Sequence, residues 1–237
     1  MPLPNLITPE FETNLPSTKQ LIKFRPFLVK EEKILLMAQE GKDNREIVNS
    51  VMKILQNCLL TPLEIDKLPM FDVEFLYLQL RAKSVGESIK LYITHAENKE
   101  CNHNNEFNLN IDDIKVQFNK DHSNIIELKD GVGLEMLYPS LLTMQNNNID
   151  IDKMDVNSIF KIIHSCVKNV FDKENVYNDF TEQELTDFVN NLSPPQFGKI
   201  VKFFQTIPKL RHTIKFKCAK CGQEVKHELN SLADFFL

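Results

Sequence analysis

Near its end the chain carries two cysteines whose spacing restricts the fold more than any other part of the sequence, Cys218-Ala219-Lys220-Cys221-Gly222. Two thiolates separated by two residues can bind one metal ion when the backbone turns tightly after the first, and a glycine behind the second suits that turn. This knuckle supplies two of the four ligands that a structural zinc ion needs. A second ligand pair must therefore come from elsewhere in the sequence.

A weak internal similarity indicates where that second pair lies. Residues 214–218 resemble residues 91–95, and a cysteine follows each run, Cys221 and Cys101 respectively. An alternating, strand-like segment comes after each of these cysteines, with the same register. The first half differs by three extra residues between its two proposed ligands. Two β-hairpin knuckles that face each other would form a zinc ribbon.

The predicted ligand set is Cys218, Cys221 and Cys101, with either His95 or His103 as the fourth member. Zinc accepts imidazole and thiolate together in a tetrahedral site. His95 is favoured, because a single residue separates His103 from Cys101, which is a tighter spacing than usual. A redox role for the knuckle is disfavoured, because no helix start follows it to lower a thiol pKa. A knuckle that binds no metal is a further alternative.

The other cysteines and the overall composition narrow the class of protein. Cys58 and Cys166 lie in apolar helical runs and are interpreted as small buried side chains. The first residues lack the pattern of a secretion signal, so we expect no disulfide framework. No run of 18 apolar residues occurs, so we expect no membrane span. A net charge of −5 argues against bulk binding to nucleic acid or to an anionic membrane.

Changes of periodicity along the chain predict an α+β fold, with helical segments flanking a small antiparallel β-sheet and a split zinc-ribbon-like module. Five prolines within the first 30 residues forbid a long helix there and favour an extended arm. The predicted segments are an arm over 1–30, helices over 31–87, an antiparallel β region with the first knuckle over 88–145, helices over 146–208, and a hairpin with the CxxC knuckle and an apolar tail over 209–237.

Local signals place several element boundaries. Thr181 with Glu184 forms a capping box, and Ser193 before two prolines is a helix N-cap. Asp130-Gly131 is a hairpin turn signal between two alternating runs. Apolar periodicity predicts one continuous helix over residues 155–171.

The sequence offers no catalytic constellation. Two acidic clusters, Asp112-Asp113 and Asp150 with Asp152, lack a general acid, base and nucleophile at useful spacing. No phosphate-binding glycine loop and no nucleophile elbow occurs. We therefore expect neither an enzyme nor a small-molecule substrate.

Two blocks of sequence resemble the T4-type baseplate hub proteins of contractile-tailed bacteriophages. The first comprises residues 15–18 and 24–38, and the second comprises residues 71–76 and 80–87. The closing run 232–236, after a cysteine-containing hairpin, also fits. The resemblance implies a part in building or forming the phage baseplate hub, in the host cytoplasm or the virion, through contacts with other hub proteins and without catalysis.

The same residues also have a purely structural interpretation. Arg25 and Pro26 would only fix the exit of the arm, Glu31 would lie on a solvated helix end, and Arg81 with Lys83 would form an exposed face. The apolar tail, with Leu232, Phe235, Phe236 and Leu237, would either contact a partner or close the protein's own core.

A second functional class rests on a basic stretch beside an aromatic residue, Phe216. A zinc ribbon that binds nucleic acid, or a transcription-accessory protein, would use these cations: Lys209, Arg211, Lys215, Lys217 and Lys220. The acidic total charge and the lack of further aromatic–basic interleaving count against it. We therefore expect protein partners, no membrane, and no nucleic acid.

Overall fold

The structure is a computed structural model that describes residues 7–41, 44–95, 101–146 and 156–229. The chain divides into two compact units. Unit 1 comprises residues 1–65, 71–117 and 209–237, and unit 2 comprises residues 66–70 and 118–208. The predicted α+β class is confirmed, but the antiparallel strands form several small sheets and not a single one.

Unit 1 begins with a β-hairpin where the sequence predicted an extended arm. Strands β1 (Phe11–Asn14) and β2 (Leu21–Phe24) pair antiparallel, with Phe11 opposite Phe24. The chain reverses at Lys19, which has a positive φ of 62° and whose backbone N–H donates to the carbonyl oxygen of Leu15. The prolines thus restrict the segment to extended backbone, and the turn folds it back on itself.

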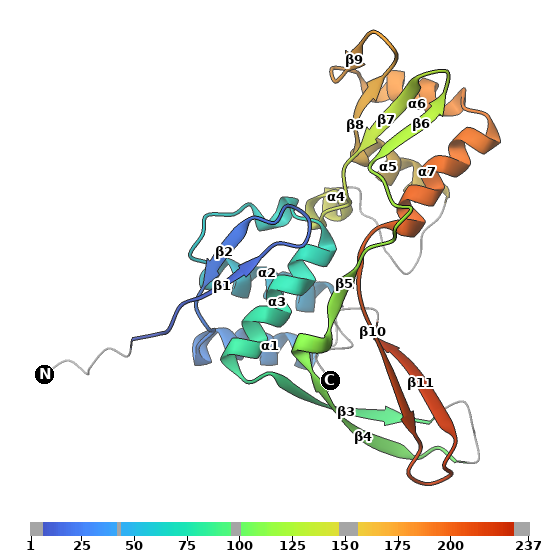
Figure 1. Ribbon diagram of the computed structural model, residues 1–237. Helices are drawn as coiled ribbons and strands as arrows, with labels where there is room; N and C mark the ends of the chain where they lie inside the picture. Colours follow the sequence, from blue (N-terminus) through green and yellow to red (C-terminus); the bar gives the residue numbers. More distant parts are fainter. Residues whose placement is uncertain (1–6, 42–43, 96–100, 147–155, 230–237) are drawn as a thin grey trace, which may run out of the picture. The chain divides into compact units, whose positions relative to one another are not determined.

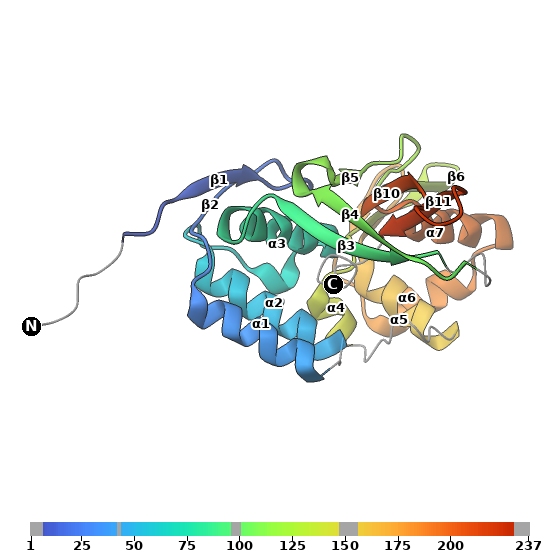
Figure 2. The ribbon, with the colours of Figure 1, turned by 90° about the horizontal axis from the view of Figure 1, so that it is seen from below.

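The helices of unit 1 follow this hairpin and lie beside one another (Figures 1 and 2). They are α1 (Val29–Gly41), α2 (Asn44–Cys58) and α3 (Met70–Ser84). Helix α3 buries side chains around most of its circumference, and two of them share a core with apolar residues between Ile89 and Ile114. The buried side chains are Phe71, Val73, Leu76, Tyr77, Leu78, Leu80 and Ala82.

Residues in the two blocks that resemble the family form hydrogen bonds between the end of the N-terminal hairpin, α1 and α3. Glu31 is fully buried; its carboxylate accepts from Arg25 Nη2 at 3.0 Å and from the backbone N–H of Leu28 at 2.9 Å. The backbone N–H of Phe27 donates to Ser84 Oγ, again at 2.9 Å. The interpretation of Glu31 as a solvated residue is therefore wrong, because it caps α1 and pairs with Arg25.

Two antiparallel hairpins complete unit 1 (Figure 1). Strand β3 (Ser88–Thr94) pairs with β4 (Asn104–Asn110), and β10 (Lys209–Lys217) pairs with β11 (Glu224–Leu229). A short strand, β5 (Lys115–Gln117), adds to β10 and gives the order β11-β10-β5. The inward rows of both hairpins form one apolar core: Ile89, Leu91, Ile93, Leu109, Leu210, Ile214 and Leu229.

Unit 2 has a sheet in the order β6-β7-β8-β9. Its strands are β6 (Ile125–Lys129), β7 (Val132–Met136), β8 (Val167–Phe171) and β9 (Val176–Tyr177). Its helices are α4 (Leu141–Asn146), α5 (Val156–Cys166), α6 (Glu182–Asn190) and α7 (Pro194–Thr206). The last three helices share an apolar core with the strands, and this core includes Leu134, Ile163, Leu185, Ile200 and Phe203.

Several helix and strand boundaries in unit 2 can be compared with those predicted from the sequence. The capping box of Thr181 with Glu184 is present, and Asp130-Gly131 turns with positive φ angles of 55° and 85°. The single helix predicted over 155–171 is wrong, because it ends at Cys166 and residues 167–171 form β8. Pairing of this β-branched and aromatic segment with β7 outweighs its helical periodicity. Asp150, Asp152 and the apolar tail lie outside the described residues.

Candidate metal centre

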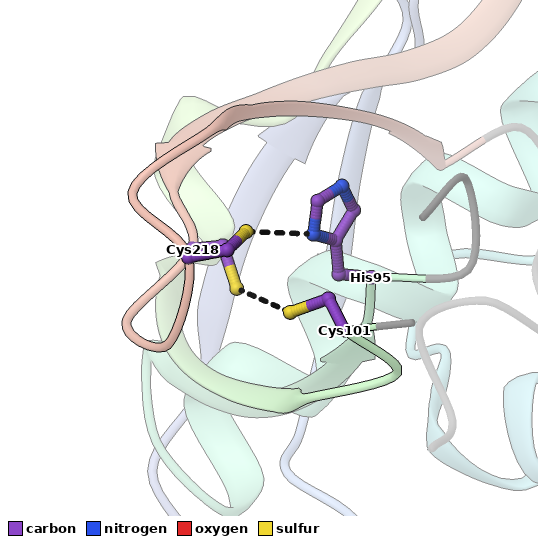
Figure 3. Close-up of side chains that lie close together, drawn as sticks. His95, Cys101 and Cys218 are labelled. Carbon is purple, nitrogen blue, oxygen red and sulfur yellow. Dashed lines mark hydrogen bonds between the residues drawn. The ribbon is translucent and has the colours of Figure 1, made fainter. Parts of the chain in front are cut away.

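The ends of the two hairpins in unit 1 bring four potential ligands together. His95 follows β3 and Cys101 precedes β4, while Cys218 follows β10 and Cys221 precedes β11. The shared apolar core packs the hairpins against each other, so their turns meet at the same end. Figure 3 shows His95, Cys101 and Cys218 pointing toward one another. These are the four residues favoured from the sequence.

The distances suit one four-coordinate ion. The ligand atoms of His95, Cys101, Cys218 and Cys221 all lie within 4.8 Å of one another. Cys101 Sγ lies 3.6 Å from Cys218 Sγ, and Cys221 Sγ lies 3.4 Å from His95 Nδ1. A tetrahedral zinc site has edges of about 3.8 Å between two sulfurs and about 3.5 Å between sulfur and nitrogen, from its usual bond lengths. The group could therefore hold a metal ion.

The second knuckle is shaped by its own backbone. The N–H of Cys218 donates to the carbonyl oxygen of Gln223 at 2.8 Å, and the N–H of Gly222 donates back to the oxygen of Cys218 at 2.9 Å. Gly222 has a φ of +72°, a conformation that L side chains rarely adopt. The glycine noted in the sequence thus closes the turn that holds both thiols on one side.

The first knuckle resolves the choice between the two histidines. His95 is 2% exposed, and its Nδ1 faces the sulfurs. His103 contributes its backbone: its carbonyl oxygen accepts from the N–H of His95 at 2.9 Å, which closes the base of the longer turn. The structure therefore brings His95 into the group and leaves His103 out of it.

Sequence reasoning missed one residue of this site, Asn105. Its Oδ1 accepts from the backbone N–H of Ala219 at 2.9 Å, and its Nδ2 lies 3.7 Å from Cys218 Sγ and 3.1 Å from the oxygen of His103. One buried amide thus connects both knuckles. The signal available in the sequence was a polar residue in the inward-facing row of β4, where its neighbours Phe107 and Leu109 are apolar.

Local dipoles favour a thiolate at this site. Backbone N–H groups of Cys221 and Lys220, together with the thiol of Cys101 and the amide of Asn105, lower the pKa of Cys218 to about 5. Burial raises the pKa of Cys101, and the neighbouring sulfurs raise it further. Lys220 Nζ donates to the carbonyl oxygen of Cys101 at 3.1 Å and places a positive charge beside the sulfurs. A cation bound between the sulfurs would stabilise the remaining thiolates.

The remaining cysteines match their apolar interpretation. Cys58 and Cys166 are fully buried, and burial raises the pKa of their thiols to about 11 and about 12 respectively. Asp112 and Asp113 form an exposed turn that is capped by the side chain of Asn110. Neither feature adds a ligand to the centre.

His122, interpreted from the sequence as structurally ordinary, occupies a defined position in unit 2. Its Nδ1 lies 2.9 Å from Thr206 Oγ1 and its Nε2 lies 3.1 Å from the hydroxyl of Tyr138. Its ring stacks on Tyr138 and Phe203. Both ring nitrogens thus have side-chain hydrogen-bond partners, so this partly buried histidine has a structural place and no free nitrogen for a ligand.

Comparison with known proteins agrees with the resemblance seen in the sequence. Residues 8–237 match the family described as T4 bacteriophage base plate protein. No curated protein and no solved structure matches the chain. Among the described residues, no helix is both long and apolar enough to cross a membrane. Because the family match covers nearly the whole sequence, the chain belongs to the T4 bacteriophage base plate protein family.

Proposed function

We propose that this protein is a non-catalytic component of the baseplate hub that acts through contacts with other hub proteins. The observation that carries the proposal is the family match over residues 8–237. The sequence blocks that resemble hub proteins support the hub as its place within the baseplate. Those blocks meet in unit 1, where Phe27 bonds to Ser84 and the backbone N–H and hydroxyl of Ser17 both donate to the Asp72 carboxylate. They therefore support a common scaffold more directly than a contact surface.

The position in the particle is tested by following the protein itself. A tagged chain produced during infection should copurify with hub subassemblies and be detected in purified virions. Its presence only in peripheral baseplate parts would contradict the hub assignment. If the protein is present in hub intermediates but not in finished virions, it acts in assembly and is not part of the mature tail.

The second part of the proposal is that the candidate centre holds one structural zinc ion. Three sulfurs and one imidazole nitrogen form a donor set that zinc accepts, and four protein ligands leave no position open for a substrate. The buried position of His95, Cys101 and Cys218 agrees with a structural site. The residues would hold the metal and tie the two hairpins together.

Metal analysis of the purified full chain tests this assignment. We expect about one zinc per chain, lost in a Cys218→Ser variant and kept in a His227→Ala variant, whose exposed histidine lies on β11 outside the centre. A metal-free wild-type protein with an unchanged melting temperature after zinc addition would contradict the zinc centre. It would leave the baseplate assignment intact.

The alternative function, nucleic-acid binding by a zinc ribbon, is supported by the exposed cations of β10. Salt-dependent binding to single- and double-stranded DNA would favour it. Phe216, the aromatic residue invoked for base stacking, is half-buried, and its ring lies 6.2 Å from the ring of Phe107. This position weakens the alternative, because a stacking platform must be open to bases.

A further inference from the structure

The outer face of the β11-β10-β5 sheet gathers positive charge in an acidic protein. Alternate residues of β10 point away from the apolar core and are exposed, and the outward positions of the neighbouring strands are exposed as well. We define the cationic face by these six side chains: Lys115, Lys209, Arg211, Lys215, Lys217 and Lys226. The chain as a whole has a net charge of −5, so the charge of this face is opposite in sign to the net charge of the protein.

Strand register sets like charges directly opposite each other. Arg211 lies opposite Lys115, and Lys215 lies opposite Lys226. Like charges at opposed positions destabilise a sheet. Lys226 has an ion pair with Glu228 at 2.5 Å, whereas the other five cations form none with any residue in the described ranges. The isolated sheet therefore carries a repulsion that an anionic partner would relieve.

The thiolates of the metal centre can offset the positive charge at only one end of the cationic face. Lys217 is adjacent to Cys218, so its charge can offset thiolates. Arg211 lies seven residues before Cys218, about 23 Å along an extended strand. Screening at physiological salt acts over about 8 Å. The opposed pair of Arg211 and Lys115 therefore has no counter-charge in the centre.

The make-up of the face favours an acidic protein over a nucleic acid. Its outward positions carry no aromatic side chain on which a base could stack, because Phe216 belongs to the inward row. Two carboxylates share the face: Glu224 lies opposite Lys217, and Glu228 pairs with Lys226, so the opposed Arg211 and Lys115 are the part of the face without a neighbouring carboxylate across the strands. Lys209 and Arg211, and likewise Lys215 and Lys217, are two residues and about 6.7 Å apart, which equals the spacing of alternate side chains on an extended partner segment.

We propose that the cationic face of the β11-β10-β5 sheet docks an acid-rich segment of another baseplate protein. The proposal rests on the assignment to the baseplate. The surface makes the contact through its six cations, while the apolar core behind it keeps the sheet rigid. Docking then offsets the repulsion between Arg211 and Lys115 and between Lys215 and Lys226.

The full-length protein tests the surface with two probes of equal length, a glutamate-rich peptide and a single-stranded DNA. An Arg211→Glu/Lys215→Glu variant should bind the peptide at least tenfold more weakly than wild type at low salt. A Lys53→Glu/Lys202→Glu variant is the matched control, because it makes the same charge change at exposed positions on α2 and α7. It should bind within threefold of wild type.

Thermal stability gives a second, independent measurement. A Lys115→Gln variant should raise the melting temperature of the free protein, because it removes the charge opposite Arg211, while it weakens peptide binding. Equal loss of binding in both double variants would overturn the proposal, since net charge alone would then be responsible. Tenfold tighter binding of the DNA than of the peptide would overturn the choice of a protein partner.

Different results would overturn the baseplate role and the proposal that the cationic face docks an acid-rich segment. A chain found in hub intermediates that does not bind the glutamate-rich peptide overturns the cationic face alone. A chain that binds the peptide through this face but is absent from every baseplate fraction overturns the baseplate role on which the partner's identity depends.

Discussion

Cys101 and Cys218 are separated by 117 residues in the sequence, yet their sulfur atoms lie 3.6 Å apart. The contact closes a loop that contains all of the β6–α7 segment of unit 2. The rows of apolar residues on β3–β4 and β10–β11 bring the hairpins together, and the knuckles then meet as a consequence. A metal ion bound there would cross-link two segments of unit 1 that precede and follow the unit 2 segment in the sequence.

Metal removal should loosen both hairpins at once. Structural zinc in small peptides contributes on the order of 10 kcal/mol to folding, and here the two knuckles would share one ion. With a chelator, we expect amide hydrogen exchange in β3–β4 and β10–β11 to rise together, while β7 in unit 2 keeps its protection. Faster exchange in only one hairpin would contradict a shared site.

Substitutions at the two histidines should separate ligand from neighbour. His95→Ala should abolish stoichiometric metal binding, because it removes the nitrogen that lies 3.4 Å from Cys221 Sγ. His95→Cys should restore binding, since zinc accepts four thiolates. His103→Ala should bind normally, because His103 contributes a backbone oxygen. Metal content of each purified variant is the measurement.

Loss of the Asn105 amide should weaken metal binding without removing a ligand. Groups that orient metal ligands typically contribute 10–100-fold to affinity, so Asn105→Ala should lower zinc affinity by about this factor. Asn108→Ala is the control, because Asn108 lies on the exposed side of the same strand. Competition with a chromogenic chelator measures both; equal affinities for the two variants would argue against the positioning role.

The contact between the N-terminal hairpin and α3 should contribute measurably to stability. The backbone N–H of Ser17 donates to Asp72 at 3.0 Å, its hydroxyl donates to the other carboxylate oxygen, and Asp72 is fully buried. Asp72→Ala leaves these donors unsatisfied, which costs about 1–3 kcal/mol. Urea unfolding should show this loss, whereas Asp66→Ala, at an exposed position, should unfold like wild type. An unchanged free energy of unfolding in Asp72→Ala would show that the contact between Ser17 and Asp72 does not stabilise the protein.

Unit 2 should lose stability in mild acid through His122. Burial lowers the pKa of His122, so the folded protein binds this proton less readily than the unfolded chain. The stabilisation is complete above the ordinary histidine pKa of about 6.5 and is lost as the pH falls below it. His122→Gln should reduce the slope of the melting temperature against pH between pH 7.5 and about 5.5, and His164, whose pKa burial also lowers, should retain the rest. An unchanged slope would assign the effect to other groups.

Much of the site was predictable because its parts are local. The spacing of Cys218, Cys221 and Gly222 encodes a turn, and the type of each side chain encodes its affinity for metal. Asn105 was not predictable by the same route, because its role consists of bonds to Ala219 and Cys218 in the other hairpin. Glu31 was likewise misread, because its burial depends on Arg25 folding back over the start of α1.

The sequence by itself determined the elements whose signals lie within a few residues. The capping box of Thr181 and Glu184 and the turn at Asp130-Gly131 are examples, since short-range hydrogen bonds and backbone φ preferences decide them. Tertiary structure alone decided which strands pair and that residues 167–171 extend a sheet, and it placed His95, which the spacing already favoured over His103, against the sulfurs. The physical reason is that burial of an apolar row depends on which other row covers it, and that partner lies tens of residues away.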